Sequence, residues 1–256
     1  MRNRRVLIGI GLVCLNVASL TAARERSETI PPEKLAEVSE ISKKADSLMV
    51  RKFFEDAVIE YSKALAINPN DPVIHNKLGI AYHQLPNLDM AKKEYERAKK
   101  LNPKYHEAWN NLGTVDYSMK KFKRAVKHYK KALQIQPESA TTHHNLGAAY
   151  FALKRFDEGF QSFQEAYRLD PNILERVSMR GTIIRTTEVN LGIQNFYIAK
   201  LYVKNGLPEK ALGYLLKALE AGFNDYDKIK QDPDFQVLAQ DERLRRMISQ
   251  PQPQTP

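Results

Sequence analysis

Residues 106–139, HEAWNNLGTVDYSMKKFKRAVKHYKKALQIQPES, carry two apolar stripes at helical spacing. Trp109, Leu112 and Val115 recur every third residue, which is typical of one face of an amphipathic helix. A second stripe, with spacings of three and four, consists of Phe122, Ala125, Val126, Tyr129, Ala132 and Leu133. Pro137 ends this second helix, because proline has no amide hydrogen to donate. The stretch therefore predicts a hairpin of two helices.

Small residues stand where the two helices should come closest. They are Gly113 on the first helix and Ala125 and Ala132 on the second. Because none of them has a large side chain, the two backbones are expected to approach each other with no side chain between them.

The same pattern recurs every 34 residues, so the hairpin is one unit of a repeat. Leu78-Gly79 and Leu146-Gly147 stand in register with Leu112-Gly113. An earlier unit keeps only the second half of the pattern, as Phe54, Ala57, Tyr61, Ala64 and Pro69. Four units follow one another without a gap over 38–173, with starts at Val38, Pro72, His106 and Ala140.

These residues resemble the tetratricopeptide repeat family, whose signature places Trp, Leu-Gly, Tyr, Ala, an aromatic residue and Pro at fixed offsets. The resemblance implies an all-α fold: a right-handed α-solenoid of helix-turn-helix repeats, closed by a C-terminal helical cap. The sequence departs from the signature around Lys44-Ala45, at Asp116, which takes the place of the tyrosine, and at Gly159, which takes the place of an alanine.

Residues 1–23 have the composition of a secretory signal peptide. Three arginines precede an apolar run from Val6 to Leu15, and small residues suitable for cleavage follow up to Ala23. Polar residues interrupt the run short of the roughly 20 apolar residues that a membrane-spanning helix needs. We predict cleavage and export to the periplasm or outside the cell; the alternative is an uncleaved N-terminal anchor that holds the chain at the inner membrane through residues 6–23.

The remaining segments follow from composition and phase. Residues 24–37 are predicted to form a linker and the start of a capping helix that carries Leu35, Val38 and Ile41 inward. Residues 174–191 lose the repeat phase, and their β-branched run disfavours a helix, so an irregular insert is expected. The last three predicted segments are a fifth repeat at 192–225, a helical cap at 226–249 and a disordered tail at 250–256.

The sequence contains no motif that is typical of an enzyme active site. The only cysteine, Cys14, lies in the predicted leader, so the exported chain would have no thiol nucleophile and no thiolate metal ligand. Nucleophile elbows, phosphate-binding glycine loops and HExxH motifs are missing from the sequence. His75 and His143 fall at the offset that Trp109 fills, which favours rings packed between helices over a zinc site. We expect no enzyme activity, no metal and no cofactor.

The family resemblance places certain offsets of each first helix in a concave groove. Asparagines recur there, and a side-chain amide both donates and accepts hydrogen bonds, so a row of them suits the backbone of an extended peptide. Asn111 and Asn145 occupy the place where peptide-binding members of the family, including the repeats of O-GlcNAc transferase, carry such a ladder. The predicted groove residues are Asn76, Lys77, Asn110, Asn111, Thr114, Tyr117, His144, Asn145 and Phe151.

The second helix of the central unit carries a basic face. Residues 120–131, KKFKRAVKHYKK, contain seven Lys or Arg and no acid, and five of these cations share one stripe: Lys123, Arg124, Lys127, Lys130 and Lys131. Repeat geometry predicts that this stripe lies on the outer, convex face. Such a stripe is suited to an anionic membrane surface, an acidic polymer or another protein, although many such stripes are only solvated helix faces.

Two functions remain open at this point. The first is a non-enzymatic scaffold that binds a partner protein or peptide in the concave groove and contributes to the assembly of a cell-envelope complex. The second is an accessory module that docks through its basic face on an anionic membrane or envelope polymer. Nucleic acid is not expected as a partner, because export removes the chain from most nucleic acid and the aromatic residues beside the lysines point inward.

Overall fold

The computed structural model of the chain describes residues 30–179 and 191–249, and within these ranges it forms helices and no strand. The α-helices are α2 (Pro32–Val50), α3 (Phe54–Ile67), α4 (Pro72–Gln84), α5 (Leu88–Leu101), α6 (His106–Ser118), α7 (Phe122–Ile135), α8 (Ala140–Ala152), α9 (Phe156–Leu169), α10 (Ile173–Met179), α11 (Leu191–Lys204), α12 (Pro208–Glu220), α13 (Tyr226–Gln231) and α14 (Glu242–Ser249), and a 3₁₀ helix, η1, spans Pro233–Leu238. The predicted leader at 1–23 and the predicted tail at 250–256 lie outside the described residues.

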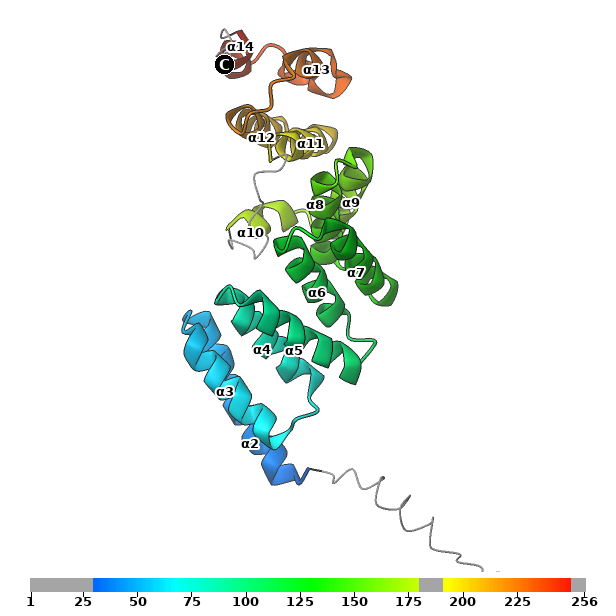
Figure 1. Ribbon diagram of the computed structural model, residues 1–256. Coiled ribbons are helices and arrows are strands. Elements are labelled where there is room, and N and C mark those ends of the chain that lie inside the picture. The colour runs from blue at the N-terminus through cyan, green and yellow to red at the C-terminus, as the bar shows by residue number, and fades with distance from the viewer. Residues whose placement is uncertain (1–29, 180–190, 250–256) are drawn as a thin grey trace, which may run out of the picture.

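The helices pack as consecutive hairpins. The pairs α2/α3, α4/α5, α6/α7, α8/α9 and α11/α12 pack against each other, and each of the first four hairpins also contacts the next. Helices α4, α6 and α8 begin at Pro72, His106 and Ala140, where the 34-residue pattern places the starts of the units. Figure 1 shows the hairpins stacked into an elongated array. The prediction of an all-helical repeat fold is confirmed.

The turns inside four of the five hairpins each use one residue in the left-handed region. Lys52, Lys120 and Lys154 have φ values of 64°, 58° and 59°, and they lie 68 or 34 residues apart along the chain. Gly206 takes the same role between α11 and α12, with a φ of 71°. Residues other than glycine rarely adopt this backbone conformation, so the backbone is mildly strained at the three lysines.

The contact at Gly113, which recurs at the 34-residue period, differs from the expected one. A Cβ added to this glycine would lie 2.5 Å from Cε1 of Tyr129, whose ring is fully buried. Gly79 meets Tyr95 in the same way, at 2.6 Å. The prediction that no side chain separates the helices is therefore wrong at Gly113, where the missing side chain makes room for an aromatic ring.

In the fourth repeat the two backbones do come close. A Cβ on Gly147 would lie 3.0 Å from the carbonyl oxygen of Gly159 as well as 2.5 Å from the ring of Phe163. A Cβ on Gly159 would lie 2.8 Å from the ring of Phe151. Glycine in place of alanine at 159 thus accommodates both the neighbouring backbone and a buried phenylalanine.

Two predictions about the ends of the repeats need correction. Residues 174–179 of the predicted irregular insert belong to helix α10, because Ile173 and Leu174 are buried where α10 packs against α8 and α9. The β-branched run at 180–190 lies outside the described residues. Leu35 was expected to point inward but is 46% exposed, because no described element covers the start of α2.

The C-terminal part continues the core of the fourth repeat. A hydrophobic cluster joins Phe151 and Phe163 to residues of α11 and α12 and to Phe235 and Leu238 of η1. Helices α13 and α14 precede and follow η1 in the chain, and both lie at this end of the array (Figure 1). Within the described part of the chain, every helix is too short or too polar to cross a lipid bilayer.

Candidate partner-binding surfaces

Four asparagine side chains connect three consecutive repeats. The Nδ2 of Asn145 on α8 donates to Oδ1 of Asn110 on α6, at 3.0 Å. Asn110 donates in turn to Oδ1 of Asn111, at 3.2 Å, and Asn111 donates to Oδ1 of Asn76 on α4, at 2.9 Å. We call these four residues the amide ladder. The four asparagines that were predicted to line a groove thus form a row, and its members are hydrogen-bonded to one another.

The two asparagines at the ends of the amide ladder are buried, and the two at its centre are partly exposed to solvent. Asn76 and Asn145 are 4% and 3% exposed, whereas Asn110 and Asn111 are partly exposed. Tyr105 also shares a hydrogen bond with Asn76. The prediction of a freely accessible row is thus wrong at its two ends, because neighbouring helices cover these side chains.

Tyr117 and Phe151 were predicted to line the groove, and both are interior residues. Their exposures are 3% and 1%. Tyr117 contacts the edge of the Phe122 ring at a centroid distance of 5.2 Å, and Phe151 stacks on Phe163 at 5.2 Å. A helix offset shows which way a side chain points, but it does not show whether the next element covers it.

Thr114 and His144 are also covered. The Oγ1 of Thr114 donates to the carbonyl oxygen of Asn110 at 3.1 Å and accepts from the hydroxyl of Tyr129 at 3.3 Å. His144 is 6% exposed and stacks on Phe163, with ring centroids 5.2 Å apart. Burial lowers the pKa of His144 to about 4, so the ring is neutral at pH 7. Both predictions of ligand contact are therefore corrected to a role in packing.

Lys77 stands where the second repeat would carry the asparagine of the ladder. Its ammonium group lies 2.7 Å from Oδ2 of Asp46 and 3.4 Å from Oγ of Ser42. The lysine side chain keeps 31% of its surface exposed. Because Asp46 already neutralises it, Lys77 is a paired cation at the edge of the ladder.

Three rings occupy one position in consecutive repeats and make the same hydrogen bond. The indole Nε1 of Trp109 donates to the carbonyl oxygen of Pro103, at 2.9 Å. The Nε2 of His75 lies 3.0 Å from the carbonyl oxygen of Pro69. For His143 the partner is the carbonyl of Pro137, at 2.9 Å. The prediction that these histidines take the packing place of Trp109 is confirmed, and a carbonyl partner fixes Nε2 as the protonated nitrogen in each.

His75 has a second partner in Glu94. Its Nδ1 lies 2.7 Å from Oε2 of this glutamate, and both side chains are almost buried. Burial acts against the charged ring, but the hydrogen bonds to Glu94 and to the Pro69 carbonyl outweigh it and raise the pKa of His75. In the described residues no three His, Cys, Asp or Glu side chains are grouped to hold a metal ion.

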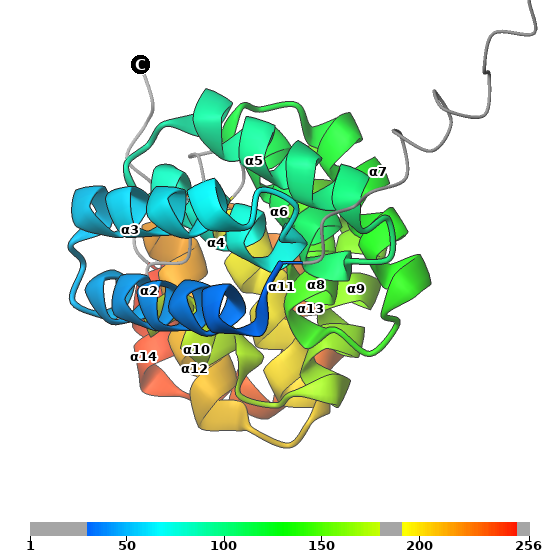
Figure 2. The same cartoon turned by 90° about the horizontal axis from the view of Figure 1, so that it is seen from below.

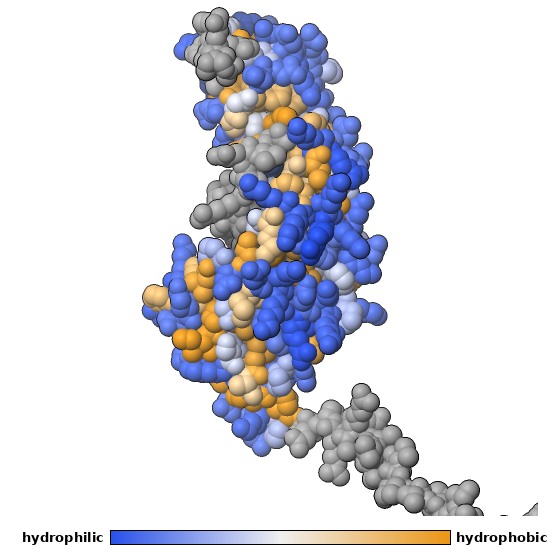
Figure 3. Space-filling model, viewed as in Figure 1, coloured by the Kyte–Doolittle hydropathy of each residue, from blue (hydrophilic) through white to orange (hydrophobic). Residues whose placement is uncertain are grey.

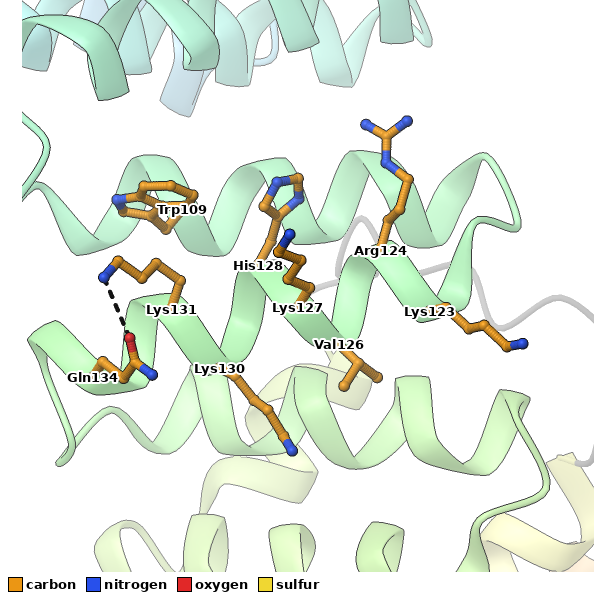
Figure 4. A pocket seen from close by; sticks show the side chains of 9 residues that line it. All are labelled: Trp109, Lys123, Arg124, Val126, Lys127, His128, Lys130, Lys131 and Gln134. Carbon is orange, nitrogen blue, oxygen red and sulfur yellow. Dashed lines mark hydrogen bonds between the residues drawn. The ribbon is translucent and has the colours of Figure 1, made fainter.

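The basic face lies on α7. Its residues Lys123, Arg124, Lys127, Lys130 and Lys131 are all exposed. Figures 1 and 2 both place α7 on the side of the array away from α10, and Figure 3 shows hydrophilic residues gathered over this side. The five cations line a hollow of about 870 Å³ together with Trp109, Val126, His128 and Gln134 (Figure 4). We call this hollow the α7 groove.

Asp116 is a buried charge whose partners the sequence did not reveal. Its side chain is 2% exposed, and its carboxylate lies 2.9 Å from Nδ1 of His128 and 3.2 Å from the guanidinium of Arg124. Burial lowers the pKa of His128, while the carboxylate of Asp116 opposes this shift. An acidic residue at a position where the repeat signature has a tyrosine predicts that cations lie nearby, because a buried charge needs a partner.

Comparison with known proteins supports the repeats directly. The sequence matches a family profile described as TPR repeat over residues 47–85 and 113–154. Two profiles described as tetratricopeptide repeat match residues 140–173 and 73–105. No curated protein sequence is similar enough to count as a relative.

Several solved structures share the fold. The structure from the functional characterization of Pseudomonas aeruginosa PilF aligns with a TM-score of 0.57 at 19% identity, over 84% of this chain and 89% of that chain. MamA from Desulfovibrio magneticus RS-1, residues 41 to the end, aligns with a TM-score of 0.53 at 19% identity, over 80% of this chain and 99% of that one. At this identity the likeness establishes the fold alone. Together the profiles match residues 47–105 and 113–173, and these repeats are similar to the tetratricopeptide repeat, a protein-binding scaffold that is typically non-enzymatic.

Proposed function

We propose that the chain binds an extended segment of a partner protein along the open centre of the amide ladder. The observation that carries this proposal is the hydrogen-bonded series from Asn145 through Asn110 and Asn111 to Asn76, which crosses three repeats. A continuous series positions the exposed pair rigidly, so a ligand would not have to order these side chains on binding.

The central pair has unused hydrogen-bonding capacity. A side-chain amide has two N–H donors and two lone pairs. Within the ladder, Asn110 and Asn111 each donate once and accept once. Each amide therefore keeps one N–H and one lone pair, which match the C=O and N–H groups of an extended backbone. Such binding tolerates many ligand sequences, because every peptide presents these groups.

The N-terminal sequence suggests where the partner is found. The basic start and apolar run of residues 1–23 have the composition of an export signal. On this basis we infer that the bound segment belongs to a cell-envelope complex. Sequencing the N-terminus of the protein recovered from cells tests this part: removal of the first 23 residues supports export, and an intact leader in the cytoplasmic fraction contradicts it.

The groove is tested by cross-linking in the cells that make the protein, followed by mass spectrometry. The test variant is the double substitution Asn110→Ala with Asn111→Ala. The control is Asn172→Ala with Asn224→Ala, which removes two exposed amides elsewhere. We expect cross-links from partner peptides to α4 and α6 to be lost in the test variant and kept in the control. Equal recovery from both variants, with thermal midpoints unchanged, would contradict binding at the ladder.

A further inference from the structure

We propose that the α7 groove is a second binding site and that it takes an extended acidic segment of a partner protein. The groove lies on the outer side of the array, away from α10, and the amide ladder joins α4, α6 and α8 (Figures 1 and 2). The two proposals therefore concern different residues and can fail separately.

The positive charge of α7 is only partly balanced by the acidic residues that the structure describes. Helix α7 has five basic residues and no acidic ones, whereas α5 and α9, the equivalent helices of the adjacent repeats, each have three acidic residues. Arg124 pairs with Asp116. Among the described residues, no carboxylate lies within 4.0 Å of the ammonium groups of Lys123, Lys127 or Lys131. All three lysines can pair with carboxylates of another chain, although Lys131 also donates to Oε1 of Gln134 at 3.3 Å.

The charges in the first turn of α7 are unfavourable for the stability of the helix. The N-terminus of a helix carries a partial positive charge, so acidic residues are favourable there and basic residues are not. Helices α3, α5 and α9 each begin with at least one acid. Helix α7 has none, its N-cap Lys121 makes no side-chain cap, and Lys123 and Arg124 follow. A bound carboxylate would offset this unfavourable charge.

The groove also has an apolar surface that a chain of amino acids can use. Trp109 is partly exposed at one end, with the ammonium group of Lys99 5.1 Å from its ring centroid and the ring of His128 at 5.9 Å. Val126 also lines the hollow, on the other side of α7, but it is only 8% exposed, so Trp109 supplies most of this apolar surface (Figure 4). A side chain of the bound segment can insert between these cations and contact the ring of Trp109. A flat lipid surface would reach the lysine tips but not this ring.

The spacing of the lysines fits an extended strand. Lys123, Lys127 and Lys131 are four residues apart on one helix, so consecutive members are separated by about 6 Å along its axis. Alternate residues of an extended chain are separated by about 6.6 Å. An acid at every second position can therefore reach all three lysines from one side. The intervening side chains face away or cover Trp109, which predicts a ligand of the form acid-x-acid-x-acid with an apolar residue near one end.

Trp109 is the only tryptophan in the chain, so its fluorescence reports on this groove directly. The probe is the synthetic peptide acetyl-Leu-Glu-Ser-Glu-Ser-Glu-amide, titrated into the full chain, and the control peptide carries Gln in place of every Glu. We expect saturable emission change with the acidic peptide and none with the control. Binding should weaken several-fold when salt is raised from about 0.05 to 0.3 M, because the pairs are exposed.

The test variant replaces Lys123, Lys127 and Lys131 with Gln. We expect peptide affinity to fall about tenfold, since each exposed ion pair contributes a factor of about two to three. The control replaces Lys93 and Lys100, exposed lysines of α5, with Gln and should bind within about twofold of wild type. Circular dichroism checks that both variants keep their helices.

Three outcomes would overturn the proposal. One is equal binding of the acidic peptide and its Gln control. Another is an unchanged affinity in the α7 variant. The third is saturation of the Trp109 signal by phosphatidylglycerol vesicles or by double-stranded DNA, at charge concentrations where the peptide does not bind. That result would assign the groove to a membrane or to nucleic acid. None of these results bears on the amide ladder, whose variants retain every lysine of α7.

Discussion

The third and fourth repeats share one hairpin and differ in what they expose. In the third, α7 presents five cations to solvent beside Trp109, and α6 keeps the central pair of the amide ladder partly exposed. In the fourth, most of α8 is buried, α10 packs against the hairpin, and α9 begins with Asp157 and Glu158. The residues that repeat build the hairpin, and those that do not repeat decide which surface can meet a partner.

The largest expected difference concerns the glycines at 113 and 147. The three atoms nearest to a Cβ on Gly113 all belong to the ring of Tyr129, whereas those nearest to a Cβ on Gly147 include the carbonyl oxygen of Gly159. A ring can shift more easily than a helix backbone, so Gly147→Ala should destabilise by about 3 kcal/mol and Gly113→Ala by about 1–2 kcal/mol. Chemical denaturation measures both.

A matched control for these two variants is Gly213→Ala on α12. A Cβ at this glycine would meet nothing within 4 Å. Alanine is the better helix former, so this change should stabilise the protein by about 0.5–1 kcal/mol. Equal effects of the substitutions at 113 and 147 would mean that the two repeats do not differ in backbone approach.

The next effect depends on pH and distinguishes the same repeats, because the fourth has His144 where the third has Asn110. Burial lowers the folded pKa of His144 from 6.5 to about 4. Below pH 6.5 the unfolded chain takes up a proton that the folded chain refuses. The stability that this group contributes is therefore complete above pH 6.5 and is lost as the pH falls toward 4.

We expect His144 to account for a loss of roughly 2.5 kcal/mol between pH 7 and pH 4.5. His83, whose pKa is likewise lowered to about 4 by burial, adds its own share. The variant His144→Phe keeps a ring to stack on Phe163 and removes the titration. Denaturation at both pH values should show a smaller loss for this variant than for wild type, and an identical loss would show that His144 is not buried as described.

The smallest effect tests whether the shared ring position is interchangeable. His143 and Trp109 make the same bond to a proline carbonyl, whereas His75 also pairs with Glu94 at 2.7 Å. His143→Trp should keep the bond and change the unfolding free energy by less than about 0.5 kcal/mol, whereas His143→Ala should cost about 1 kcal/mol. A loss on the tryptophan substitution as large as on alanine would contradict the equivalence.

The repeat period was enough to predict most of the fold. Helices α4, α6 and α8 start where the 34-residue phase places them, because apolar spacing and the prolines between units are local signals. Helix α10 was missed at 174–179, since a short segment outside the phase is held by burial of Ile173 and Leu174 and not by a local signal.

The candidate site was predicted less well. Offsets on a first helix identified the asparagines that form the amide ladder, but they did not show that Asn145 and Phe151 are covered. Coverage depends on neighbouring elements that no single-helix pattern contains. Asp116 was seen only as a departure from the signature, because its contacts with His128 and Arg124 join two helices.

The left-handed lysines at the hairpin turns have a practical consequence. Lys52 and Lys154 hold a backbone conformation that costs a residue with a Cβ about 1 kcal/mol and costs glycine almost nothing. They belong neither to the amide ladder nor to the α7 groove. Replacing these lysines with glycine or asparagine should raise the thermal midpoint of the protein in small additive steps. It would change no residue of the amide ladder or of the α7 groove.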